Sequence, residues 1–116
     1  MTTAATPPTV VIALTTVGDE SHARQLAHTL VDERLAACVN ILPAMTSIYR
    51  WQGSVSEDRE HQVIMKTTRD RLDALRARVH ELHSYELPEF LVIATDDASA
   101  AYRGWVEESV RPDVRQ

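Results

Sequence analysis

The hydrophobic pattern at the start of the chain changes period at Gly18. Residues 9–17 are β-branched and apolar with little alternation, which is typical of an interior strand covered on at least one face. Asp19 then stands where a helix N-cap is expected. After it, apolar residues recur at helical spacing, namely Ala23, Leu26, Ala27, Leu30 and Val31. The pattern predicts a strand followed by an amphipathic helix.

The next segment reads as a strand that is too long for the domain carrying it. Residues 37–52 would extend about 50 Å at roughly 3.3 Å per residue, whereas a compact chain of this size has a radius of gyration of about 13 Å. Pro43 predicts a bulge or bend in this strand. Gly53 and Ser54 read as a turn, and residues 60–67 as the returning strand. An overhanging hairpin is marginal alone in water, so we expect it to pair with a neighbouring copy of the chain.

The remaining pattern completes a mixed fold. Thr68 is expected to cap a second helix, and this helix must end before Pro88. Residues 89–95 read as a last strand. Asp96 and Asp97 are expected to open a third helix that ends before Pro112. The order β-α-β-β-α-β plus a C-terminal helix predicts an α+β, ferredoxin-like sandwich with both crossover helices on one sheet face. The other face needs a cover, from the third helix or from neighbouring subunits, and the long hairpin favours subunits.

Length and charge narrow the class of protein. The 116 residues suit a single domain, expected over residues 9–111, with a disordered tail at 1–8 and a C-terminal tail at 112–116. The net charge of -5 disfavours nucleic acid and anionic membranes as partners. A single cysteine, Cys38, excludes an intrachain disulfide and fits a reducing cytoplasm, and we expect a buried structural thiol there. Neither a signal peptide nor a membrane span is expected from the apolar runs.

Several segments together resemble the CutA divalent-cation tolerance family. They are 35–41 (LAACVNI), 47–53 (SIYRWQG), Glu60 ahead of Lys66 and Thr67, 83–89 (HSYELPE), and Tyr102 with Trp105. The resemblance runs in order from Thr9 to Trp105. It implies a ferredoxin-like protomer in a tight homotrimer, a link to copper and other divalent cations, likeness to PII signalling proteins, and no settled enzymatic activity.

Candidate binding chemistry gathers in one short stretch. His83, Tyr85, Glu86 and Glu89 lie where the second helix gives way to the last strand. Glu60 and Lys66 share one face of their strand because their separation is even. Together these groups suit a divalent ion or a small anionic ligand. Two plainer interpretations stay open: His83 as a cation favoured by the helix dipole, and Glu86 as a solvated turn residue.

Aromatic residues indicate where subunits meet. Tyr49 and Trp51 alternate onto one face of the overhanging hairpin, where subunit packing is favoured over stacking on a substrate. Trp105 is expected at the interface as well, and Trp51 is also a candidate at the ligand site. The three glycines form no phosphate-binding loop. Local spacing supports no Ser-His-Asp or Cys-His constellation, so the sequence predicts that the protein is not an enzyme.

One departure from the family bears on copper. Family members that bind it use a cysteine at the end of the first strand and two adjacent histidines, and the matching positions here are Thr15, Leu82 and His83. Without the thiolate that best selects Cu(I), we expect only weak divalent binding, for example of Cu(II), through His83 with Glu86 or Glu89. His22 and His28 on the first helix are expected to face solvent.

The leading hypothesis is therefore a trimeric, cytoplasmic, non-enzymatic protein of divalent-cation tolerance, which needs no cofactor and holds an ion or small ligand in clefts between subunits. The alternatives are a PII-like module that senses a metabolite, and an undiscovered enzyme that acts on a small molecule through His83, Lys66 and the nearby carboxylates.

Overall fold

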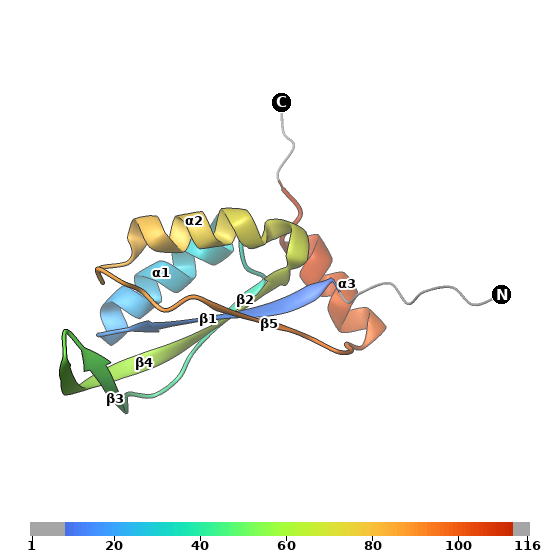
Figure 1. Cartoon of the computed structure of the whole chain (residues 1–116). Coiled ribbons are helices and arrows are strands. Elements are labelled where there is room, and N and C mark those ends of the chain that lie inside the picture. The colour runs from blue at the N-terminus through green and yellow to red at the C-terminus, as the bar shows by residue number, and fades with distance from the viewer. Residues whose placement is uncertain (1–8, 113–116) are drawn as a thin grey trace.

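A computed structural model describes residues 9–112 of the chain (Figure 1). The tail expected at 1–8 and residues 113–116 of the expected C-terminal tail lie outside the described residues. The strands are β1 (Val10–Val17), β2 (Cys38–Ile41), β3 (Met45–Trp51), β4 (Ser54–Thr68) and β5 (Leu91–Ala94). The helices are α1 (Glu20–Asp32), α2 (Leu72–Leu82) and α3 (Ala100–Ser109), and a 3₁₀ turn, Arg69–Arg71, precedes α2.

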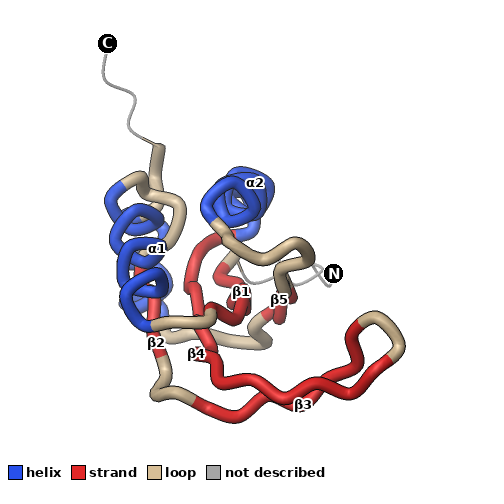
Figure 2. Tube along the Cα trace, turned by 90° about the vertical axis from the view of Figure 1, so that its left-hand side faces the viewer, coloured by secondary structure: helices blue, strands red, loops and turns tan. Residues whose placement is uncertain are grey.

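The fold is a mixed α+β arrangement around an antiparallel sheet. Its strand order is β2-β4-β1-β5, and β3 pairs with the outer half of β4. Helices α1 and α2 lie together over one face of the sheet, and α3 lies at the end where β1 begins (Figure 1). The main core forms between the sheet and these two helices, around Val11, Met65, Leu26, Leu30 and Leu75. Figure 2 shows the β3–β4 hairpin projecting from the sheet beyond this core.

The expected long strand is interrupted, and the uninterrupted strand is its partner. Pro43 separates β2 from β3, as its lack of an N–H donor requires, and β4 runs for 15 residues from Ser54, earlier than the expected start at residue 60. The turn falls on Gln52 (φ 50°) and Gly53 (φ 84°), one residue earlier than expected. Two residues with positive φ suit a tight hairpin because they match the twist of the flanking strands.

The helix starts show which capping signals were reliable. The Asp19 prediction is confirmed, since its carboxylate accepts a hydrogen bond from the His22 amide at 2.7 Å. Thr68 does not cap a backbone amide; its hydroxyl donates to Asp70 at 2.5 Å, and the 3₁₀ turn follows. The third helix begins at Ala100 rather than at the two aspartates, because the Ser99 hydroxyl supplies the N-cap.

One face of the sheet stays largely uncovered in a single chain. Side chains alternate along each strand, so five apolar residues point away from α1 and α2: Ile12, Leu14, Ile64, Leu91 and Ile93, here called the open sheet face. Leu91 is 56% exposed and Ile93 49% exposed. Helix α3 covers only one end of the sheet, where Val106 and Val110 pack with Val10 and Ala37. An apolar strip of this kind marks a contact surface.

Candidate functional site

A groove of about 1070 Å³ lies between the β3–β4 hairpin and the loop that follows α2. The hairpin supplies one wall through Tyr49, Trp51 and Glu60, and the loop supplies the other through Tyr85 and Glu89. The strand register puts Tyr49, Trp51 and Glu60 on one hairpin face, because directly opposed residues share a face and alternate residues return to it. The fold therefore gathers most of the candidate ligand residues around one hollow.

Tyr85 and Glu60 form the innermost contact across the groove. The Tyr85 hydroxyl donates to Oε2 of Glu60 at 2.6 Å. Burial, together with the negative charge of Glu60, raises the pKa of Tyr85, so the phenol keeps its proton. Gly18 makes room for this ring, because a Cβ there would lie 3.3 Å from the Tyr85 hydroxyl oxygen. The sequence predicted that Glu60 shares a strand face with Lys66, and the structure gives Glu60 the Tyr85 hydroxyl as its hydrogen-bond partner.

A second phenol and carboxylate pair lies further out on the hairpin. The Tyr49 hydroxyl donates to the Asp58 carboxylate, and this hydrogen bond is the main cause that raises the pKa of Tyr49. Trp51 follows on the same face and is 37% exposed in the single chain. Asp58 was not among the sequence candidates, although its separation of two residues from Glu60 would have placed both carboxylates on one strand face.

Glu89 is tied to the sheet by Gln62, another residue that sequence reasoning missed. The Gln62 side-chain amide donates to Glu89 and to the Thr15 carbonyl, both at 2.8 Å. This amide fixes the start of the segment that leads into β5. Glu86 lines the groove and is exposed.

His83 ends α2 with both ring nitrogens engaged. Its Nε2 lies 2.7 Å from the Thr16 carbonyl and must donate to it, while Nδ1 accepts from the Tyr85 amide at 3.1 Å. The ring is therefore neutral, and burial lowers its pKa. His22 is half-buried rather than solvent-facing, because its Nε2 donates to the Leu82 carbonyl at 3.0 Å. His28 is exposed, as expected.

A metal role for His83 and Glu89 stays a prediction. A metal ion on Nδ1 would displace the hydrogen bond from the Tyr85 amide, and one on Glu89 would compete with Gln62. Within residues 9–112, no three or more His, Cys, Asp or Glu side chains are grouped so that they could hold a metal ion. Any such ion would need water or another subunit to complete its coordination.

Lys66 and Cys38 lie away from the groove. They are opposed across β2 and β4, on the same sheet face as Ile12. Lys66 is six residues from Glu60 along β4, or about 20 Å at 3.3 Å per residue, so a ligand role beside Glu60 would need a second subunit. Cys38 is half-exposed in the single chain, not buried as expected. Trp105 on α3 packs against Tyr102, with ring centroids 5.5 Å apart, and is 48% exposed.

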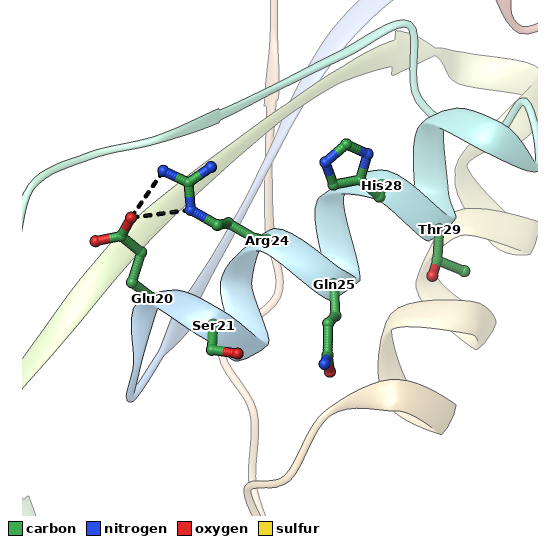
Figure 3. Close-up of a pocket in the computed structure, with 6 residues that line it drawn as sticks. All are labelled: Glu20, Ser21, Arg24, Gln25, His28 and Thr29. Carbon is green, nitrogen blue, oxygen red and sulfur yellow. Dashed lines mark hydrogen bonds and ion pairs between the residues drawn. The ribbon is translucent and has the colours of Figure 1, made fainter.

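A second hollow lies on the outer face of α1 (Figure 3). All the side chains drawn there come from one helix, and Arg24 forms an ion pair with Glu20 at 2.8 Å. Exposed pairs of this kind, one turn apart, are ordinary helix stabilisation. His28 lies eight residues, about two helical turns, from the carboxylate of Glu20, which is already paired with Arg24, so these side chains do not converge on a common ligand.

The arrangement defines a class of small α+β proteins: an antiparallel sheet backed by two helices, with a projecting hairpin that forms an aromatic and acidic groove. The family model described as "CutA1 divalent ion tolerance protein" matches residues 11–109, and the chain belongs to this family. The resemblance noted in the sequence is thereby confirmed.

Relatives and solved structures agree with this assignment. The divalent-cation tolerance protein CutA of Thermus thermophilus is 46% identical, over 84% of this chain and 95% of its own length. The chloroplastic CutA 1 of Oryza sativa is 37% identical over 94% of this chain, which spans 61% of that protein. The structure of CutA from Synechococcus elongatus is 42% identical with a TM-score of 0.86, covering 90% of this chain and 92% of that one. These relatives are named as tolerance proteins or by the family name, not as enzymes.

In the described residues, no helix has the length and apolar character needed to cross a membrane.

Proposed function

We propose that this chain forms a cytoplasmic, non-enzymatic homotrimer that contributes to divalent-cation tolerance, and that its groove, completed by a neighbouring subunit, holds an ion or a small ligand. The observation that carries the proposal is the family match over residues 11–109, together with relatives named for divalent-cation tolerance. The fold is consistent with a ferredoxin-like protomer, because the strand order β2-β4-β1-β5 follows from a doubled β-α-β unit.

The trimer is supported by what a single chain leaves exposed. The open sheet face carries Leu91 and Ile93 about half-exposed, and Ile48, Tyr49 and Trp51 on the hairpin are exposed as well. A folded protein gains stability when such apolar area is removed from water, at about 25 cal/mol per Å². Neighbouring copies would cover both surfaces at once, because the hairpin projects beyond its own core.

The proposed metal site binds divalent ions weakly and favours Cu(II). His83 supplies an imidazole whose pKa is lowered by burial, so the ring is neutral and able to coordinate near pH 7. Glu89 or Glu86 would supply oxygen ligands, and the general order of divalent affinities puts Cu(II) above Zn(II) at such a site. No cofactor is required for the fold.

Two measurements test the proposal. A host strain that lacks its own CutA protein should recover growth in elevated copper when it expresses this chain, and recover less with His83→Ala. Calorimetry with Cu(II) and Zn(II) should show Cu(II) binding that His83→Ala weakens at least tenfold. His28→Ala, an exposed histidine on α1, is the matched control and should change nothing. If the host strain stays as sensitive to copper when it expresses the wild-type chain as when it expresses the His83→Ala variant, the proposed role is contradicted.

A further inference from the structure

Strand β4 passes from the sheet into the projecting hairpin between Glu60 and His61 (Figure 2). Met45, the first residue of β3, lies opposite Glu60, whereas Val17, the last residue of β1, lies opposite His61. The ladder partner of β4 therefore changes between two consecutive residues. Two-stranded ribbons twist more strongly than wide sheets, and a lone hairpin is only marginally stable in water. Backbone pairing alone therefore fixes the direction of the hairpin only weakly.

The first side chain at this point is held by the loop that follows α2. The Tyr85 hydroxyl donates to Oε2 of Glu60 at 2.6 Å. The Tyr85 ring is itself packed against the main body of the protein, because the His83 ring lies 4.7 Å from it between centroids and Gly18 leaves room for its hydroxyl group. Since Glu60 is the last β4 residue paired with β3, this hydrogen bond joins the hairpin to the rest of the chain.

The next two residues of β4 are tied to other elements as well. Nδ1 of His61 donates to the Leu42 carbonyl at 2.8 Å, in the connection between β2 and β3. The Gln62 side-chain amide donates to Glu89 and to the Thr15 carbonyl, both at 2.8 Å. Because adjacent strand residues point to opposite faces, His61 is held on one face of β4 and Gln62 on the other. Consecutive side chains thus restrain β4 from both faces at the point where the hairpin leaves the sheet.

We propose that residues 60–62 form an anchored junction, which sets the direction of the projecting hairpin from within each chain rather than leaving it to a neighbouring subunit. The junction also sets the width of the groove, because the hairpin forms one of its walls. In the proposed homotrimer, on which this consequence alone rests, a hairpin that is already oriented loses less conformational freedom when subunits associate.

Double electron–electron resonance on the full chain measures the direction of the hairpin. Nitroxide labels are attached at Ser54→Cys beside the hairpin turn and at Gln25→Cys on α1, both exposed positions, in a Cys38→Ser background. Excess unlabelled chain leaves one labelled subunit per oligomer, so the measured distance lies within one chain. The unaltered junction should give a single narrow distance distribution. Tyr85→Phe and Gln62→Met, which remove separate ties with little change of side-chain size, should each widen it at least twofold at half height.

The matched control is Tyr49→Phe, which removes the same hydroxyl group from a phenol–carboxylate contact that lies wholly inside the hairpin. Its distance distribution should equal that of the unaltered junction. The inference is overturned if the unaltered junction already gives a broad distribution, if both junction variants keep a narrow one, or if the control widens it equally. A narrow distribution that Tyr85→Phe widens, in a chain that light scattering shows to be a monomer, would support the inference and contradict the proposed trimer.

Discussion

Truncation of Ile93 tests whether the open sheet face is buried between subunits. Ile93 lies opposite Ile12 on β1 and is 49% exposed in the single chain. Deletion of a fully buried isoleucine side chain to alanine costs about 2–5 kcal/mol. In a monomer, where about half of the side chain is already in water, Ile93→Ala should cost roughly half of that, about 1–2.5 kcal/mol. In a trimer the full 2–5 kcal/mol per chain applies.

The assay is chemical denaturation at two protein concentrations about fiftyfold apart. Mass action makes the unfolding midpoint of an oligomer depend on concentration, so Ile93→Ala should lose most stability at the lower concentration. Val31→Ala is the control, because Val31 is 42% exposed on α1, away from the open sheet face. The reasoning is refuted if both variants lose similar stability and neither midpoint moves with concentration.

Three further predictions follow from single contacts. Thr15→Val should leave stability unchanged or raise it by up to about 1 kcal/mol, because the buried Thr15 hydroxyl has no hydrogen-bond partner in the described structure; thermal unfolding that shows a clear loss would contradict this. Asp19→Ala should cost about 1 kcal/mol by removing the α1 N-cap, measured by denaturant unfolding against Asp32→Ala near the other end of the helix. Burial lowers the folded pKa of His83 below its ordinary 6.5, so as pH falls the unfolded chain binds this proton before the folded chain does. The contribution of neutral His83 to the free energy of unfolding is therefore complete above about pH 6.5 and is lost as pH falls through the folded pKa. Unfolding free energies measured between pH 5 and 8 should therefore fall less steeply at the acidic end for His83→Gln than for the wild type, and parallel curves would reject the assignment.

Local sequence signals were sufficient for much of the fold. Asp19 precedes a run with clear helical period, and Pro43 interrupts a strand because proline has no amide hydrogen to donate. The start of α3 was misplaced because Asp96, Asp97 and Ser99 all favour N-caps, and only the course of the chain after β5 selects Ser99. Sequence preferences alone do not decide between neighbouring capping residues.

The candidate site was predicted in outline and missed in its contacts. Strand alternation correctly placed Tyr49 and Trp51 on one hairpin face, because two strand residues separated by an even number of positions point to the same face. The hydrogen bond from Tyr85 to Glu60 joins residues 25 positions apart through the packing of a loop on a hairpin, which no local pattern encodes. Gln62 was missed for the same reason, because an amide in a strand gives no sign of its partner across the sheet.

The most direct test of the proposed assembly is the mass of the purified chain by light scattering at micromolar concentration. A mass three times the 13.0 kDa of one chain is expected, because in the proposed trimer neighbouring subunits cover both the open sheet face and the projecting hairpin. A folded, monodisperse species with the mass of a single chain would contradict the assembly and the groove completed by a second subunit. A dimer would contradict the trimer while leaving the open sheet face as a contact surface.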